Sequence, residues 1–196
     1  MQENDLNSKS KTRRIEILTV ASALYMKYGY HGTTLEAIAA KLGITRAALY
    51  RYFSSKDELF FQCHEAAYGQ FLTELGRLVQ IENPRERLEK MIERHILLLL
   101  RDFPMFGPIL QSLNSLPDEY RKTVIELRVK VEKIYEACIR QWREQEPGAI
   151  KDLEDAFIMK AILSTINAVP RWGKRENNPA DVAKKMVSIL IDGIKN

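Results

Sequence analysis

The segment from Thr45 to Tyr52, TRAALYRY, carries hydroxyl, aromatic and guanidinium side chains but no acid. At helical spacing, Ala48 and Leu49 turn toward a core while the polar and aromatic side chains turn outward. Hydroxyl and guanidinium groups donate hydrogen bonds to phosphates and to base edges, so this face suits the major groove of DNA. The alternative is a helical hairpin in an all-helical core, in which Tyr50 and Tyr52 are only packing residues.

The elements around this segment predict a helix-turn-helix. Apolar residues from Leu35 to Leu42 recur at helical spacing, Gly43 supplies a left-handed residue that ends this helix, and Thr45 is a good N-cap for the next one. Two helices joined by a short turn that contains glycine form this motif.

No constellation in the sequence favours catalysis or metal binding. Cys63 and His64 are adjacent, so on a helix their side chains diverge by about 100° and do not pair as nucleophile and base. The sequence has no Gly-rich phosphate loop, and its 2 cysteines, Cys63 and Cys138, form neither a disulfide framework nor a metal spacing. We therefore expect a protein that is not an enzyme and that uses no cofactor and no metal.

The basic residues are concentrated around the predicted motif. Residues 1–56 carry nine Lys and Arg against four Asp and Glu, which is +5, while the remaining 140 residues carry 21 against 22, which is −1. Such an excess is expected where a domain meets phosphates. The N-terminal cations, which reach the DNA backbone or else form a solvated tail, are Lys9, Lys11, Arg13 and Arg14.

The N-terminus is polar and lacks the apolar core of a signal peptide. No run in the sequence reaches the roughly 18 apolar residues that a membrane span needs. We expect a cytoplasmic protein with no membrane partner.

The flanks of the motif carry further features at fixed spacing, namely Gly29-Tyr30, Thr33-Thr34, the run LYRYF from Leu49 to Phe53, and Lys56. With them, the run from Arg13 to Phe60 resembles the DNA-binding domain of the TetR family of bacterial repressors. This resemblance assigns DNA contacts to Thr34, Thr45, Arg46, Ala47 (through its backbone), Tyr50, Arg51, Tyr52 and Lys56. Arg51 departs from the small, polar or aromatic residues frequent at its position in the family.

The rest of the chain keeps helical spacing and shows no strand-like alternation. We expect an all-α protein of about nine helices. Residues 1–55 would form a three-helix, helix-turn-helix DNA-binding domain, and residues 56–196 a helical ligand-binding and dimerisation domain. Outside the motif, helices are expected at about 12–28, 55–81, 85–101, 109–115, 118–145, 153–174 and 179–194.

The last two expected helices are apolar on more than one face, which predicts that a second subunit covers them. The alternative is a central, fully buried position inside the monomer. Members of the resembled family pair through their last two helices into a four-helix bundle. The expected dimer interface consists of Phe157, Ala161, Ser164, Thr165, Ala168, Val182, Met186, Ile189, Leu190 and Gly193.

Large, soft side chains in the second domain suit an apolar ligand pocket, although such residues also serve as plain packing. The segment NAVPRWGK, from Asn167 to Lys174, resembles the acyl-CoA-responsive branch of the family, which controls fatty-acid and sterol side-chain degradation. Its alternative role is structural, with Pro170 kinking the helix and Trp172 sealing the dimer seam. The expected ligand residues are Met91, His95, Phe106, Tyr135, Trp142, Asn167, Arg171 and Trp172.

These expectations describe a regulator, most simply a repressor, that binds a palindromic double-stranded operator as a homodimer. A small apolar inducer, with a long-chain acyl-CoA as first candidate, would release it through the helix that starts at Ser55. The alternatives are a drug-responsive efflux-type repressor with a different ligand, and a DNA-binding protein that responds to no ligand.

Overall fold

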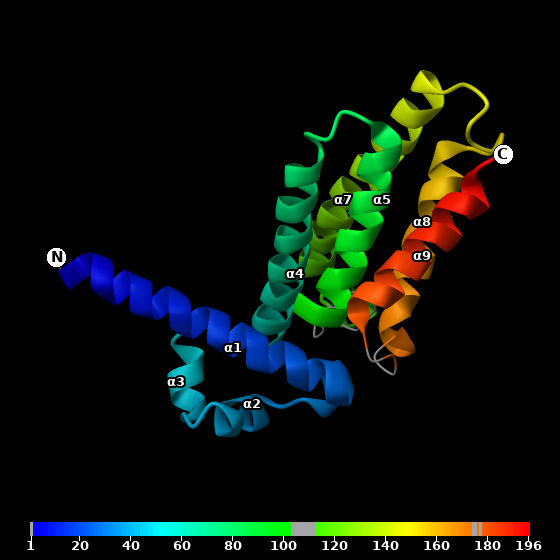
Figure 1. Ribbon diagram of the computed structural model, residues 1–196. Helices are drawn as coiled ribbons and strands as arrows, with labels where there is room; N and C mark the ends of the chain where they lie inside the picture. Colours follow the sequence, from blue (N-terminus) through cyan, green and yellow to red (C-terminus); the bar gives the residue numbers. More distant parts are fainter. Residues whose placement is uncertain (1, 103–112, 174–175, 177) are drawn as a thin grey trace. The chain divides into compact units, whose positions relative to one another are not determined.

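Helices make up the regular structure of this protein (Figure 1). The structure is a computed structural model that describes residues 2–102, 113–173, 176 and 178–196, without the side chains of residues 2–9 and 102. Within these ranges no strand occurs, and an isolated β-bridge pairs Ile150 with Lys195. The expected all-α fold is therefore confirmed.

The described residues form eight α-helices, a π-helical segment and two short 3-10 helices. In chain order they are α1 (Gln2–Gly32), α2 (Leu35–Lys41), α3 (Arg46–Tyr50), α4 (Lys56–Leu78), α5 (Pro84–Leu97), η1 (Leu98–Asp102), η2 (Leu113–Ser115), α7 (Asp118–Gln145), α8 (Asp155–Ala168), η3 (Val169–Arg171) and α9 (Pro179–Ile194).

The chain divides into two compact units. Unit 1 consists of Met1–Ala67 and Pro108–Val124, and unit 2 of Tyr68–Gly107 and Ile125–Asn196. Helices α4 and α7 each contribute residues to both units. These ranges differ from the expected division at residue 55 because the first turns of α4 and α7 pack within unit 1.

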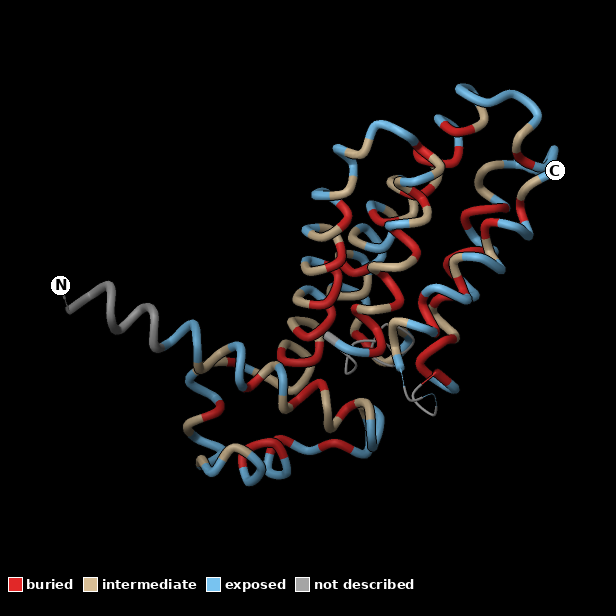
Figure 2. Tube along the Cα trace, in the orientation of Figure 1, coloured by how far each residue is buried: buried red, intermediate tan, exposed pale blue. Residues whose placement is uncertain are grey.

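The core of unit 1 joins α1, α2, α3 and the start of α4, and buried positions recur on one side of each helix (Figure 2). Tyr25 of α1 meets Phe60 of α4 edge to face, with ring centroids 4.6 Å apart. Gly29 interrupts α1 with a φ of 72°, a conformation that glycine adopts without strain. The chain changes direction at Gly29, before α2 begins at Leu35.

Unit 2 contains α5, which presents Leu88, Ile92 and Ile96 on one buried face. Asn83 caps this helix, because its side chain accepts a hydrogen bond from the backbone N–H of Glu86 at 2.9 Å. Helix α9 packs chiefly against α5.

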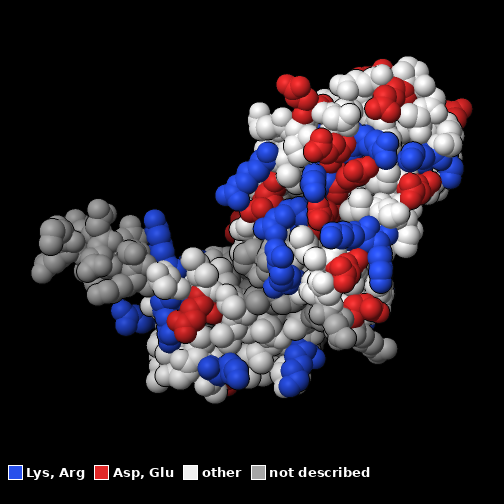
Figure 3. All heavy atoms as spheres, viewed as in Figure 1, with Lys and Arg blue, Asp and Glu red and all other residues white. Residues whose placement is uncertain are grey.

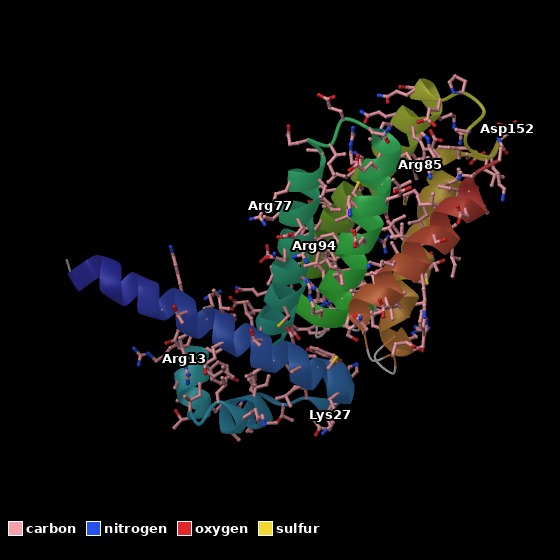
Figure 4. The ribbon with its side chains drawn as sticks, in the orientation of Figure 1. Arg13, Lys27, Arg77, Arg85, Arg94 and Asp152 are labelled. Carbon is pink, nitrogen blue, oxygen red and sulfur yellow. The ribbon has the colours of Figure 1, made fainter. Side chains whose placement is uncertain are left out.

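An ion-pair cluster also joins α4 to α5 within unit 2. Arg77 and Arg94, both labelled in Figure 4, each donate to the carboxylate of Glu74 at 2.8 Å.

The π-helical segment η1 follows α5 directly, and its residues Leu98, Leu99 and Leu100 are buried. It packs against η3. A Cβ atom added to Gly173 would lie 2.9 Å from Cγ1 of Val169 and 3.3 Å from the Leu100 methyl groups. A side chain at Gly173 would therefore push η1 and η3 apart.

In the part of the chain that the structure describes, no helix has the length and apolar character needed to cross a membrane.

Candidate functional site

The turn between α2 and α3 is closed by backbone hydrogen bonds around Gly43. The N–H of Gly43 donates to the carbonyl of Ala40 at 3.2 Å, and the N–H of Ile44 donates to the carbonyl of Ala39 at 3.0 Å. This pair of bonds is the Schellman motif, and it requires the left-handed φ of 66° that Gly43 has. The predicted glycine turn is confirmed, and it sets the angle at which α3 leaves α2.

Two threonines cap the helices of the motif. Thr34 Oγ1 accepts from the backbone N–H of Ala37 at 3.1 Å, and Thr45 Oγ1 accepts from that of Ala48 at 3.1 Å. Both threonines are exposed. Since the Thr45 cap uses its hydroxyl as an acceptor, the Thr45 proton stays available to donate to a phosphate, whereas the Thr34 hydroxyl also hydrogen-bonds to the Glu36 carboxylate.

The first residue of α3, Arg46, is held in a defined position on the surface. Its guanidinium donates to Glu36 Oε1 at 2.5 Å and to the Tyr50 hydroxyl at 2.8 Å, and it lies 5.3 Å from the Tyr50 ring centroid. The backbone N–H of Glu36 and the nearby Arg46 lower the pKa of the Glu36 carboxyl. Arg46 and Tyr50 therefore form one exposed donor group on α3, with an acid beside it.

The remaining predicted DNA contacts also reach the surface. Ala47 and Arg51 are exposed, and Tyr52 and Lys56 are half-buried. Among the described residues, no hydrogen bond or ion pair holds the Arg51 side chain. Lys56 Nζ lies 4.2 Å from the ring centroid of Tyr30.

Two of the N-terminal cations make hydrogen bonds within the chain. Arg14 Nη1 donates to the carbonyl of Tyr52 at 2.9 Å, and its Nη2 donates to Gln62 Oε1 at 2.5 Å. Arg13 donates to Glu16 at 2.5 Å. Arg14 therefore ties α1 to the end of the motif and to α4. The Lys9 side chain lies outside the described residues.

The surface charges differ between the parts of the chain (Figure 3). Over α4 and α5, Lys and Arg atoms stand beside Asp and Glu atoms, and the ion pairs Arg85–Glu89 and Lys90–Glu93 account for part of this pattern. Residues 1–56 contain the ion pairs Arg13–Glu16 and Arg46–Glu36 and still keep a positive excess.

Four of the predicted ligand residues lie in the interior of unit 2. Met91, His95, Tyr135 and Trp142 are each at most 3% exposed. His95 Nδ1 lies 3.1 Å from the Tyr135 hydroxyl, and its ring is stacked at a tilt on Phe71 with centroids 4.3 Å apart. Burial lowers the pKa of His95 to about 3, so this histidine is neutral at physiological pH.

The other predicted ligand residues lie at the end of α8 and just beyond it, or outside the described residues. Asn167 is half-buried, while Arg171 and Trp172 are exposed. Phe106 and Lys174 lie outside the described residues. The structure therefore does not bring Arg171 and Trp172 together with the buried set in the interior.

The predicted dimer residues separate into an exposed group and a buried group. On α8, Ala161, Ser164 and Thr165 are exposed, and Phe157 retains 59% of its accessible surface. On α9, Ile189 is 63% exposed, whereas Val182 and Met186 are 5% and 6% exposed. Ala168 and Leu190 are half-buried, and Gly193 is exposed.

This separation corrects the expectation for Val182 and Met186. They belong to the face of α9 that packs inside the chain, so they have no surface to offer a partner. Helix α9 also exposes the charged residues Lys184, Lys185 and Asp192, so its apolar residues cover more than one face but not all of them.

Sequence reasoning missed two contacts in unit 1. Glu36 pairs with Arg46 from ten residues away, which no periodic signal predicts. Phe61 of α4 stacks on Tyr120 of α7, with centroids 4.6 Å apart and an interplanar angle of 17°. The second contact joins the starts of α4 and α7.

The capped helix pair, its glycine turn and its outward donor groups define a helix-turn-helix protein with a second, helical unit. Residues 17–63 match the family model described as bacterial regulatory proteins of the tetR family. Residues 82–194 match the model described as the tetracyclin repressor-like C-terminal domain. The chain belongs to the TetR family of transcriptional regulators.

Relatives resemble the chain over nearly its whole length. The fatty acid metabolism regulator protein of Bacillus subtilis is 23% identical, and the match covers 96% of this chain and 98% of that protein. The regulator PfmR of Thermus thermophilus has a similar structure, with 28% identity, a TM-score of 0.81, and coverage of 92% and 99%. AibR in complex with isovaleryl coenzyme A and operator DNA has 27% identity, a TM-score of 0.83, and coverage of 91% and 98%.

Proposed function

We propose that this regulator is a repressor that binds a palindromic operator as a homodimer and leaves it when an acyl-CoA binds unit 2. The observation that carries the DNA part is the exposed face of α2 and α3. There Thr45 keeps a hydroxyl proton to donate, and Arg46 and Tyr50 form a preorganised donor group. Such groups position a recognition helix on phosphates and read base edges.

The homodimer is supported by the exposed side of α8 and α9, which contact each other in unit 2. Phe157 and Ile189 are large apolar residues that are more than half exposed, and Ala161 and Ser164 are small enough to allow close helix approach. A two-fold dimer presents two recognition helices, so its operator has two half-sites in successive major grooves.

An acyl-CoA is the proposed effector because AibR, a relative similar over the whole chain, binds isovaleryl coenzyme A. In this chain the guanidinium of Arg171 suits a phosphate, and the exposed indole of Trp172 suits the adenine ring. The apolar interior of unit 2 around Met91 and Tyr135 suits an acyl chain.

Release requires that the effector bind better to a conformation in which the two recognition helices no longer match the half-sites. The sequence suggested α4 as the only continuous element from the motif to the apolar domain. The structure corrects this, since α7 also contributes its first residues, up to Val124, to unit 1. In this proposal both α4 and α7 transmit the effect of ligand binding from unit 2 to the helix-turn-helix. A coupling of about 1–3 kcal/mol, typical of allosteric systems, lowers operator affinity roughly 5- to 150-fold.

The test begins with an operator selected from random DNA by the purified protein. The operator complex is then titrated with octanoyl-CoA and stearoyl-CoA, with the matching free fatty acids, and with hydrophobic cations. Release by a thioester but not by its free acid supports the proposal. Release by the cations alone points to an efflux-type repressor. Operator binding that no compound alters points to a protein that responds to none of these ligands.

A further inference from the structure

A short hydrogen-bonded chain runs through the apolar interior of unit 2. The Tyr135 hydroxyl donates to the backbone carbonyl of Met91 at 3.1 Å, and the same hydroxyl lies 3.1 Å from His95 Nδ1. All three residues are buried, from helices α5 and α7. These hydrogen bonds therefore link α5 and α7 through polar atoms that are out of contact with water.

Both contacts of the Tyr135 hydroxyl are hydrogen bonds at the same time when Nδ1 of His95 carries the proton. A tyrosine hydroxyl has one proton, and here Tyr135 gives it to the Met91 carbonyl. The Tyr135 oxygen therefore accepts from His95, so Nδ1 is the protonated nitrogen. In a neutral imidazole the other nitrogen, Nε2, then has a lone pair and no proton. Burial supports the neutral form, because it lowers the pKa of His95.

Nε2 of His95 has no hydrogen-bond partner among the described residues, although the residue is only 3% exposed. A buried acceptor without a partner destabilises the folded protein, because it has lost its hydrogen bonds to water. The neighbours four residues away on either side, Met91 of α5 and Leu99 of η1, are fully buried apolar residues. An apolar side chain in place of His95 would avoid this cost, and none of the described residues donates a hydrogen bond to Nε2.

We propose that Nε2 of His95 accepts a hydrogen bond from the effector, and that the effector of this regulator therefore carries a hydrogen-bond donor on the part that enters unit 2. This inference rests on the proposed function, because it assumes that unit 2 is where the effector binds. The chemical class is a hydroxyl or an amide N–H. A saturated acyl chain has neither, and an ionised carboxylate offers only acceptors.

An acyl-CoA has two sources of such a donor. A hydroxyl on the acyl group is one, and the amide N–H groups of the pantetheine arm are the other. Because Tyr135 is the partner of His95 on α7, a donor bound at Nε2 acts on the contact between α5 and α7. The effector would thereby reach one of the two helices that extend into unit 1.

The first measurement needs no effector. Nitrogen NMR of protein labelled at histidine distinguishes a protonated Nδ1 from a protonated Nε2. We expect His95 to carry its proton on Nδ1, with a shift at Nε2 typical of a bare nitrogen. Adding 1-octanol should move the Nε2 signal, whereas octyl methyl ether, which has the oxygen but no donor, should not. A proton on Nε2 in the free protein would overturn the inference.

The second measurement compares octanoyl-CoA with 3-hydroxyoctanoyl-CoA on wild-type protein, His95→Asn and His95→Gln. Asn keeps a donor near the Tyr135 side and lacks the distal acceptor, whereas Gln places an amide oxygen near the position of Nε2. We expect His95→Asn to weaken binding roughly 3- to 10-fold and His95→Gln to restore part of it.

The pattern of loss identifies the donor. If His95→Asn loses affinity only for 3-hydroxyoctanoyl-CoA, the acyl hydroxyl is the donor to Nε2. If it loses affinity equally for both thioesters, a pantetheine amide N–H is the donor. If both thioesters bind His95→Asn as tightly as wild type, the inference is wrong while the proposed function stands. If neither thioester binds wild type, the proposed effector class fails, and the octanol and ether comparison decides about His95 by itself.

Discussion

At the scale of single residues, the buried histidines make stability depend on pH. Burial lowers the pKa of His64 to about 4 and that of His95 to about 3, from an ordinary value of 6.5. Between these values the unfolded chain binds protons that the folded chain does not bind. The free energy of unfolding therefore falls as the pH is lowered from 6.5, by about 1.4 kcal/mol per pH unit for each histidine.

The variant His64→Leu tests this dependence. Both ring nitrogens of His64 lack a partner among the described residues, so leucine removes the titrating group without breaking a hydrogen bond that the structure shows. Urea unfolding at about pH 6.5 and about pH 5, where carboxylates stay ionised, should show a smaller difference for the variant. Equal differences for variant and wild type would mean that His64 titrates normally.

Glu36 is the residue that sequence reasoning left out of the DNA-binding surface. Its carboxylate neutralises Arg46 at the start of α3, and both side chains are more than half exposed, 57% and 55%. We expect Glu36→Gln to tighten binding to random-sequence DNA, because Arg46 becomes free for a phosphate. The slope of log affinity against log salt should steepen by about one.

A matched control for this substitution is Glu16→Gln, since Glu16 pairs with Arg13 at the same distance of 2.5 Å on α1. Glu16→Gln removes one negative charge, as Glu36→Gln does, but at a position away from α3. If Glu16→Gln strengthened non-specific binding as much as Glu36→Gln, the effect would be net charge and not the release of Arg46.

At the scale of elements, replacing glycine with alanine should have opposite effects on stability in the turn at Gly43 and at Gly69 in the middle of α4. Neither Gly43 nor Gly69 has an atom within 4 Å of an added Cβ, so only backbone conformation distinguishes them. Gly43→Ala should destabilise the protein by about 1–2 kcal/mol, because the φ is 66°. Gly69→Ala, inside α4, should stabilise it by about 0.5–1 kcal/mol.

Chemical denaturation of the two variants measures both changes. Operator affinity should fall for Gly43→Ala beyond what the loss of folded protein explains, because α3 leaves the turn at a different angle. Equal operator affinity for the folded forms of Gly43→Ala and wild type would contradict this role of the turn.

The stack of Phe61 on Tyr120 joins the starts of the two helices that run through both units. We expect Tyr120→Ala to bind operator nearly as wild type does and to be released less by an effector, because α7 loses its aromatic contact with α4. Ile125→Ala on the same helix, at a residue 36% exposed, is the control. If the effector released Tyr120→Ala and wild type from the operator equally, the contact between Phe61 and Tyr120 would play no part in release.

At the scale of the whole molecule, we propose that the exposed side of α8 and α9 forms the dimer interface. We expect the wild type to have twice the chain mass in sedimentation and Phe157→Asp and Ile189→Asp to be folded monomers, since each substitution places a charge on the surface that the proposed dimer buries. Lys184→Asp, on an exposed position of α9, should stay dimeric.

Met186→Asp is expected to behave differently from these variants. Met186 is 6% exposed, so aspartate there puts a charge into the chain's own core and unfolds it. Circular dichroism separates this outcome from a folded monomer. A folded, dimeric Ile189→Asp would place the interface on another surface.

The amino-acid sequence by itself determined the features that depend on residues close along the chain. The cap at Thr45 and the left-handed turn at Gly43 were predicted from the sequence, because each depends on hydrogen bonds or backbone angles within one turn. Helical periodicity predicted the all-α class for the same reason, and the fixed spacing of the motif predicted the family.

Only the tertiary structure decided which of several equivalent helix faces is buried and which distant groups meet. Periodicity could not show that Met186 lies inside and Ile189 outside, because both lie on an apolar helix whose neighbours are set by packing. The pairing of His95 with Tyr135 joins residues 40 positions apart, and that of Arg14 with Gln62 joins residues 48 apart. Such contacts follow from how helices pack in three dimensions, and no local pattern encodes them.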